Sequence, residues 1–415
     1  MVNTFFKALI SSPLIAIMIL IVMANVNVNY QPEVTLDDGR IVNGDLIKEI
    51  RGLKDALNSD EDLKMQRMYP EGYMFLNVIY SLAWCNLLEG DKSAEIVKEG
   101  LAEIQKAWKK ISDSHGRAPF SEELSPPFGS FYKGWSTYLL GRKLNLEAVH
   151  QRDEKEVAQF RQQCEEISKA VQEKVYPVSY YGGAWPADVL VSVASLSLHD
   201  RVFEAKYSQT IHDWLDNVKK QLDVNGLIPH SVRPSDGRPI EKARGSSLAL
   251  MLIFLRDIDE RLANAQFKLF KEKFIDTKFG LTGIREYSKD EFGMGDIDSG
   301  PILFGFGGAA TIVGMQTLFL YGEYELSVKI RNTIEALGFP FVNGNEKKYF
   351  FGMLPIADAF IAWSHSRVSP DLMIDPSFTT FRIYSILIFA LLSIFFWILM
   401  ASKKSSKKSL HILWE

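Results

Sequence analysis

The chain has 415 residues, of which 47% are hydrophobic and 24% are charged, and its formal net charge at pH 7 is −4. This composition is typical of a globular protein with some additional membrane-spanning sequence. When the two ends of the chain are set aside, 41 basic and 50 acidic residues remain, so the middle carries a charge of −9. An acidic middle region argues against a nucleic acid as the partner.

An apolar run lies at each end of the chain. Residues 8–24 form a run of 17 uncharged residues, and residues 383–401 form one of 19. Because about 20 apolar residues cross a bilayer as a helix, we expect a transmembrane helix at residues 378–401. For residues 1–25 we expect a retained transmembrane anchor, and the alternative is a cleaved signal peptide.

The basic residues next to these runs predict the orientation of the chain. Lys7 precedes the first run, and residues 402–415 form a tail with four lysines after the second. Positive charge close to a span stays on the cytoplasmic side. We therefore expect both termini in the cytoplasm and the main domain outside it, with the lipid bilayer as a partner.

The two cysteines, Cys85 and Cys164, fall in different segments, one apolar and one charged. A disulfide between them is possible but not favoured by this placement. Cys/His spacing of the kind that binds a metal is absent from the sequence. We expect no metal and no cofactor.

Between the two ends, six segments share one pattern, in which glycine, proline, aromatic or charged residues are followed by an apolar run. They begin roughly every 50 to 60 residues, which is long enough for a helical hairpin. The segments begin at Tyr69, Gly129, Tyr180, Glu241, Asp298 and Lys347.

Amphipathic stretches alternate with the apolar runs. Their apolar residues recur at helical spacing, which predicts helices with one solvated face. They cover residues 44–57, 93–111, 156–175, 207–222, 267–274 and 323–337. Six apolar and six amphipathic helices predict an all-α fold, an (α/α)6 toroid of about twelve helices at residues 42–366, flanked by the two transmembrane helices.

In this layout the sequence resembles the six-hairpin (α/α)6 barrel superfamily. That superfamily includes glycoside hydrolases, polysaccharide lyases, sugar epimerases and a terpene dehydratase-isomerase. The resemblance covers about residues 42–366 and rests on the period of the segments. The alternative is a helical repeat or bundle without a cavity.

In such a toroid the residues just before each apolar run, here called the rim, line a funnel. Unpaired N–H groups at helix N-termini favour anionic or hydroxyl-rich ligands there. Aromatic side chains and carboxylates together are typical of a carbohydrate site, and they are equally typical of a rim of helix caps. The rim aromatic residues that we expect to bind substrate are Tyr73, Trp135, Tyr181 and Trp185.

Two aspartates precede the fifth apolar run, in the sequence GDIDSGP. Asp298 is placed to cap a helix whose first turn holds Pro301. The alternative is catalytic, because Asp296 beside Asp298 would raise its pKa and suit it to act as a general acid.

Asp188 in GGAWPADVL is either an acidic residue in a first helical turn or a partner of Asp298 across the funnel. Two such carboxylates would be the acid and the base of an inverting hydrolysis if they lie roughly 6.5–9.5 Å apart.

Three further residues are candidates for substrate binding. His230 and Arg244 belong to a long loop at residues 225–247, and long ordered loops are often functional. For His230 the alternative is a structural hydrogen bond, and for Arg244 it is an ion pair with Glu241 or a rim aspartate. Asp358 lies inside an apolar run and needs a partner, for which a rim arginine is expected.

These patterns predict an enzyme that acts on a carbohydrate or similar polar molecule by hydrolysis, elimination or isomerisation, with Asp298 and Asp188 as acid and base and Asp296 tuning one of them. Motifs of phosphate-loop, dinucleotide-binding, serine-hydrolase and zinc-protease chemistry are absent from the sequence. The alternatives are a non-catalytic module that binds a glycan, lipid or protein, and a scaffold with a filled centre.

Overall fold

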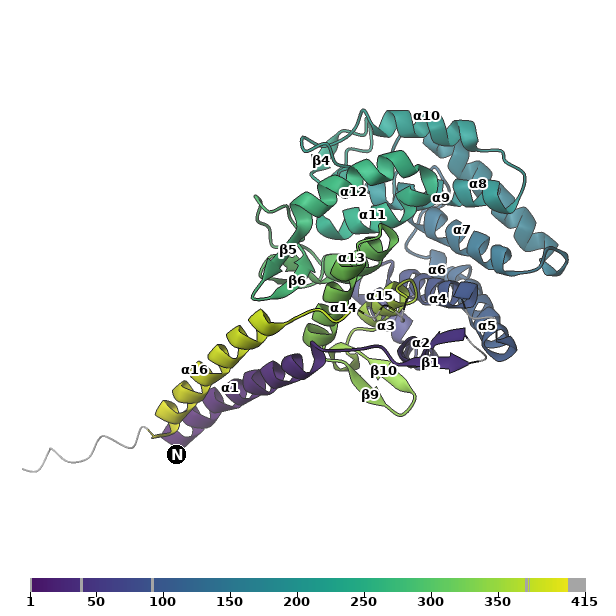
Figure 1. The fold of residues 1–415 in the computed structure, drawn as a ribbon. Helices are drawn as coiled ribbons and strands as arrows, with labels where there is room; N and C mark the ends of the chain where they lie inside the picture. The colour runs from purple at the N-terminus through teal and green to yellow at the C-terminus, as the bar shows by residue number, and fades with distance from the viewer. Residues whose placement is uncertain (1, 38–39, 91–92, 370–371, 373, 402–415) are drawn as a thin grey trace, which may run out of the picture.

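The structure is a computed structural model that describes residues 2–37, 40–90, 93–369, 372 and 374–401. The predicted cytoplasmic tail at residues 402–415 lies outside the described residues. The described chain is mostly helical, with a body of packed helices and two long helices that project from it side by side (Figure 1).

The two projecting helices contain the apolar runs of the two ends. Helix α1 covers Val2–Asn27 and helix α16 covers Thr379–Ala401, and the two contact each other. Both are long and apolar enough to cross a membrane. The Ser385 hydroxyl donates a hydrogen bond to Oδ1 of Asn25 at 3.0 Å, near the end of both helices that joins the body.

Six apolar helices form a closed circuit of contacts in the body. Each contacts the next along the chain, and the last contacts the first. They are buried on nearly all sides, which explains why their sequences are apolar without a polar stripe. The six are α4 (Gly72–Gly90), α7 (Gly129–Leu146), α9 (Pro186–Val202), α11 (Gly245–Ile258), α13 (Gly308–Leu320) and α15 (Pro355–His365).

Six amphipathic helices pack outside this circuit, each against at least one of its helices. They are α2 (Gly44–Asn58), α5 (Ala94–Ile111), α8 (Glu154–Glu173), α10 (Ser208–Val218), α12 (Glu260–Phe274) and α14 (Tyr324–Gly338). All six predicted amphipathic stretches are therefore helical. Two short helices, α3 (Glu61–Met68) and α6 (Ser114–Arg117), complete the connections.

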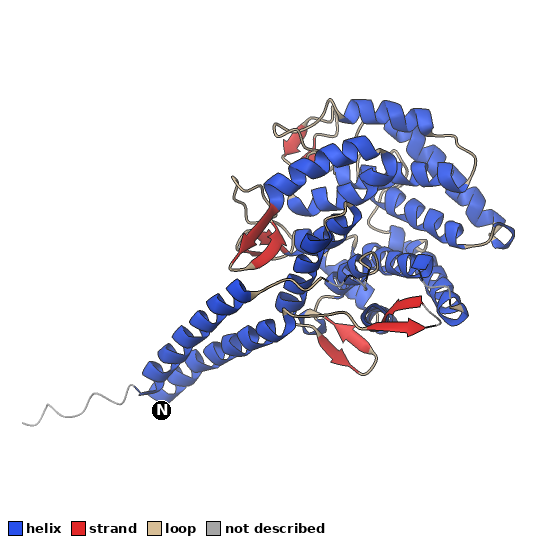
Figure 2. Ribbon diagram, in the orientation of Figure 1, coloured by secondary structure: helices blue, strands red, loops and turns tan. Residues whose placement is uncertain are grey.

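The described strands are short and form five separate antiparallel hairpins (Figure 2). Each hairpin lies in a connection between helices or beside the base of a projecting helix. The pairs are β1 (Val34–Asp37) with β2 (Arg40–Asn43), β3 (Ser231–Val232) with β4 (Pro239–Glu241), β5 (Ile275–Lys278) with β6 (Leu281–Ile284), β7 (Ile302–Leu303) with β8 (Phe306–Gly307), and β9 (Phe341–Asn343) with β10 (Glu346–Lys348).

Aromatic side chains from four of the inner helices pack against one another. The Trp135 ring lies 5.1 Å from Phe75, 5.4 Å from Phe254 and 6.4 Å from Trp363 between ring centres. Because these rings belong to α4, α7, α11 and α15, they fill the space that these helices enclose. The predicted role of Trp135 in substrate stacking is not supported, since its side chain is completely buried in this aromatic cluster.

Two details differ from the sequence prediction. Helix α13 begins at Gly308, so Asp298 does not cap it, and residues 302–307, predicted to be helical, form the β7–β8 hairpin. The continuous apolar sequence hid this hairpin, because a short apolar strand and a short apolar helix have similar sequences.

Cys85 and Cys164 are buried free thiols, so they form no disulfide with each other.

Candidate functional site

Three carboxyl groups from separate parts of the chain influence one another electrostatically. They belong to Glu71, Asp188 and Asp298, here called the acidic site. Glu71 and Asp298 both raise the pKa of Asp188, and Glu71 raises that of Asp298. Two of the predicted catalytic residues, Asp188 and Asp298, are therefore near each other in the fold.

Asp188 lies in the first turn of α9, two residues after the proline that begins the helix. Its side chain is buried, and the Ser179 hydroxyl lies close enough to stabilise its ionised form. Burial raises the pKa of Asp188 to about 7, and the charges of Glu71 and Asp298 add to the shift. A carboxyl group with this pKa holds a proton near neutral pH and can give it to a substrate.

Asp298 lies in the connection between β6 and β7 and is exposed to solvent. The surrounding protein raises its pKa to about 6 by removing hydration, and the charges of Glu71 and Asp296 contribute further. Such a group is ionised at pH 7 and able to accept a proton. Asp298 is thus the better base and Asp188 the better acid of the two.

Glu71 is the member of the acidic site that the sequence places at the rim but to which the prediction assigned no role. It precedes α4 by one residue, and its Oε1 accepts a hydrogen bond of 3.0 Å from the Tyr180 hydroxyl. Its buried Oε2 has no hydrogen-bond partner among the described residues. Burial raises the pKa of Glu71. Its position before the first apolar run, equivalent to that of the rim aspartates, was the available signal.

Arg244 and Asp296 form an ion pair next to the acidic site. The guanidinium contacts Oδ2 of Asp296 through Nη1 and Oε1 of Glu241 through Nη2, the latter at 2.8 Å. It also lies over the ring of Tyr287 at 5.5 Å. Asp296 loses hydration at this site, but Arg244 and the Ser299 N–H outweigh that effect and lower its pKa. The ion pair proposed as the alternative role of Arg244 is present.

His230 lies beside this ion pair. Its Nδ1 is 3.1 Å from the Ser247 hydroxyl, and its Nε2 is 3.6 Å from Oε2 of Glu241. Burial, followed by the charge of Arg244, lowers the pKa of His230 to about 4. The imidazole is therefore neutral at pH 7 and acts there as a hydrogen-bonding group.

A further carboxyl group near Arg244 belongs to Glu286, which is completely buried. It accepts a hydrogen bond of 2.8 Å from the Ser246 hydroxyl at the start of α11. Burial raises the pKa of Glu286 to about 7. Since the side chain is fully enclosed, we assign it to fixing the start of α11.

Of the other predicted binding residues, two lie near the acidic site. Tyr180, whose hydroxyl donates a hydrogen bond to Glu71, has its ring centre 5.4 Å from that of Tyr181 and 5.2 Å from that of Trp185. Tyr181 is 70% exposed, whereas Trp185 is partly covered. The two together offer an aromatic surface next to Glu71 and Asp188.

Tyr73 and Asp358 have structural partners of their own. The Tyr73 hydroxyl donates a hydrogen bond to Asp113 at 3.3 Å from a buried ring. Oδ1 of Asp358 accepts a hydrogen bond of 2.7 Å from the backbone N–H of Tyr349. This partner differs from the rim arginine that we expected. Burial and the charge of Glu49 raise the pKa of Asp358 to about 8.

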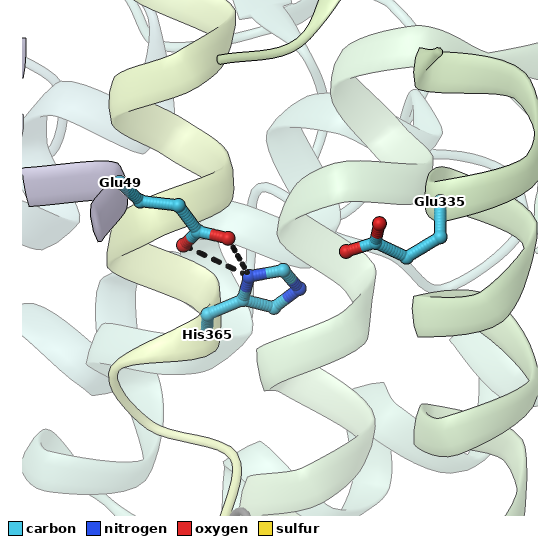
Figure 3. A group of neighbouring side chains, drawn as sticks. All are labelled: Glu49, Glu335 and His365. Carbon is cyan, nitrogen blue, oxygen red and sulfur yellow. Dashed lines mark hydrogen bonds and ion pairs between the residues drawn. The ribbon is translucent and has the colours of Figure 1, made fainter. Parts of the chain in front are cut away.

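A second cluster of polar side chains is buried between α2, α14 and α15. Glu49 of α2 accepts a hydrogen bond from Nδ1 of His365, 2.9 and 3.0 Å from its two oxygens, with Glu335 of α14 facing them (Figure 3). Ligand atoms of these three residues lie within 4.8 Å of one another, as a metal ion would require.

This cluster already contains its own cation. Lys347 Nζ lies 2.9 Å from Oε1 of Glu335, and the Tyr349 hydroxyl lies 2.7 and 2.8 Å from Glu335 and Glu49. Burial alone would raise the pKa of Glu49, but His365, Lys347 and Tyr349 outweigh it and lower that pKa. We call Glu49, Glu335, Lys347, Tyr349 and His365 the buried network, and we interpret it as a structural ion cluster.

Comparisons with known proteins leave the function to be argued from these geometries. The sequence matches no protein-family model, and a search of curated proteins found no match to it.

Proposed function

We propose that this protein is a membrane-anchored enzyme that acts on a carbohydrate or similar polyhydroxyl molecule by carboxylate acid/base catalysis. The observation that carries the proposal is the coupling of Asp188 and Asp298, whose pKa values are raised to about 7 and about 6. Perturbed carboxyl groups that influence each other concentrate at catalytic sites.

The closed circuit of six apolar helices supports an (α/α)6 toroid. In such a fold the residues before the inner helices gather at one end, and Glu71, Asp188 and Asp298 each precede or begin an inner helix or the connection leading to it. That arrangement accounts for three carboxyl groups, more than 200 residues apart at the extremes, meeting in one place.

In this proposal Asp188 is the general acid and Asp298 the general base. Asp188 holds its proton until about pH 7, and Asp298 loses its proton above about pH 6. Activity would therefore rise as Asp298 ionises and fall as Asp188 ionises, giving a narrow optimum between the two values. Because the groups are coupled, the two limbs belong to the pair as a whole.

The substrate class follows from the groups around the acidic site. The exposed ring of Tyr181 and the partly covered ring of Trp185 suit the flat apolar face of a sugar. Raised pKa values weaken the charge at the site, which suits a neutral, hydroxyl-rich molecule better than a cation. The neutral His230 and the guanidinium of Arg244 add hydrogen-bonding groups nearby.

We further propose that α1 and α16 anchor the protein in a membrane, with the body on the extracytoplasmic side and both termini in the cytoplasm. Support comes from the length and apolar surface of both helices and from the four lysines that follow the second.

A second candidate is a non-catalytic glycan-binding module. It is favoured by the aromatic cluster of Trp135, Phe254 and Trp363, which fills the space between inner helices and confines any ligand to the rim. A binding module would use the same surface without proton transfer.

The experiment uses the full chain in detergent with a panel of defined neutral oligosaccharides, and mass spectrometry of the products. Hydrolysis adds the mass of one water to the summed products, elimination adds none and leaves a double bond, and isomerisation preserves the mass. We expect turnover by the wild-type protein and a loss of at least about 100-fold in Asp188→Asn and Asp298→Asn.

The matched control is Asp213→Asn, an exposed aspartate on α10, which should keep full activity. Wild-type binding of an oligosaccharide without any product, unchanged in the two rim variants, would establish the binding module instead. Equal turnover by wild-type protein and both rim variants would refute the acid/base assignment.

A further inference from the structure

Two hairpins beside the base of α16 present phenylalanine at their tips. The β5–β6 hairpin turns through Phe279 and Gly280, and the β7–β8 hairpin turns through Phe304 and Gly305. The two phenylalanine rings lie 4.8 Å apart, and they are 45% and 59% exposed. Large aromatic side chains are thus held together on the surface.

The backbone of both turns is unfavourable for phenylalanine. Both central residues have positive φ, with values of 51° and 83° in the first turn and 55° and 91° in the second. Two-residue turns of this type prefer Asn-Gly or Asp-Gly, because a bulky residue is strained at positive φ. The β9–β10 hairpin follows the usual chemistry, with Gly344 at positive φ in its turn.

The position of the two tips explains why an aromatic residue would be placed there despite the strain. The Phe279 ring lies 5.5 Å from Tyr384 in the second turn of α16. A Cβ atom on Gly280 would lie 2.4 Å from the backbone nitrogen of Phe381, so the tip is pressed against the start of this helix (Figure 1). The tips therefore lie at the level where α16 leaves the body.

An exposed apolar surface continues from the tips along α16. Leu303, next to Phe304, is 47% exposed, and most apolar side chains of α16 from Ile383 onward are exposed. In membrane proteins, Tyr and Trp concentrate at the level where a span meets the headgroups. Tyr384 is such a residue near the start of α16, and the apolar rings of Phe279 and Phe304 continue from it onto the body.

We propose that Phe279, Leu303 and Phe304 form a lipid-contacting edge that enters the headgroup region of the bilayer beside α16. The inference rests on the proposed membrane insertion of α16. It adds that the body lies against the membrane along this edge. The body would then have a fixed orientation relative to the bilayer surface.

The experiment places a nitroxide spin label at single engineered cysteines of the full chain in phosphatidylcholine–phosphatidylglycerol nanodiscs. Cys85 and Cys164 are completely buried, which keeps them from competing for the label. Three variants are compared: Phe304→Cys at the edge, Leu391→Cys on the exposed face of α16, and Val224→Cys, which is 85% exposed in a turn of the body. Collisions with dissolved oxygen report lipid, and collisions with a water-soluble nickel complex report solvent.

We expect the label at Leu391 to report the deepest lipid, the label at Phe304 a shallower lipid position, and the label at Val224 water. Water at Phe304 together with lipid at Leu391 would overturn the lipid-contacting edge and leave the membrane anchor intact. Water at Leu391 would overturn the anchor and the edge with it. Low collision with both reagents at Phe304 would show that protein covers the edge, as in contact with a second copy, and would also overturn the proposal.

Discussion

Replacing Asp188 by asparagine tests the acidic site without a substrate. The variant keeps the size and polarity of the side chain, and it removes the titrating proton. In the wild-type protein the folded state binds this proton more tightly than the unfolded chain does. The stability of the wild-type protein should therefore fall as the pH rises, and the variant should lack this fall.

The magnitude follows from the shift of the Asp188 pKa from 3.8 to about 7. At about 1.4 kcal/mol per pH unit, ionising this group costs the folded protein about 4 kcal/mol once the pH exceeds 7. This is an upper value, since Glu71 and Asp298 share in the coupling. Between about pH 5 and about pH 8 the cost grows by about 2–3 kcal/mol.

The assay is thermal unfolding of wild-type and Asp188→Asn protein at these two pH values. With an unfolding entropy of roughly 0.7 kcal/mol/K for a body of this size, the Tm of the variant should gain about 4 °C on wild type between the lower and the higher pH. Asp213→Asn, on the exposed side of α10, should change the Tm equally at both. A Tm difference for Asp188→Asn that does not grow with pH would refute the reasoning.

Three further predictions concern the same measurement. Tyr180→Phe removes the hydrogen bond that the Tyr180 hydroxyl donates to the Glu71 carboxyl, and it should cost about 1–3 kcal/mol. The cost should be larger at pH 8 than at pH 5, because the pKa of Glu71 rises further; an equal loss at both pH values would contradict this. Lys347→Met leaves two buried glutamates without their cation and should cost about 3–5 kcal/mol, whereas Lys329→Met, in a surface pair on α14, should cost below about 1 kcal/mol. Trp135→Ala should lower the free energy of unfolding by about 3–5 kcal/mol, because the side chain is completely buried. A variant of normal stability with impaired substrate binding would instead show that Trp135 contacts the substrate.

The helices could be predicted from the sequence because their period repeats many times over. The apolar runs from Tyr69 and Gly129 are helical almost throughout, as are the amphipathic stretches between the runs. The prediction failed where a short element carried little pattern. The β7–β8 hairpin has two residues in each strand, and its apolar residues continued the pattern of α13.

The acidic site was predicted in part. Asp188 and Asp298 were selected because each stands before an apolar run, and their pKa values depend on each other in the fold. Glu71 has the same kind of position, but its role depends on a hydrogen bond from Tyr180, 109 residues away. The hydrogen bond between Glu49 and His365 joins residues 316 apart in the chain, and no local sequence pattern predicts it.

The two ends of the folded body meet at the buried network. Asn332 of α14 donates hydrogen bonds to the backbone carbonyls of Val28 and Tyr30, just after α1, and His365 bonds Glu49 shortly before the chain turns toward α16. The segment that follows α1 and the segment that precedes α16 are thus both fixed at this part of the body. A single protease cut anywhere in the body would therefore give two fragments, one ending in α1 and the other in α16. If both helices are inserted in a membrane as proposed, neither fragment would be released by that cut.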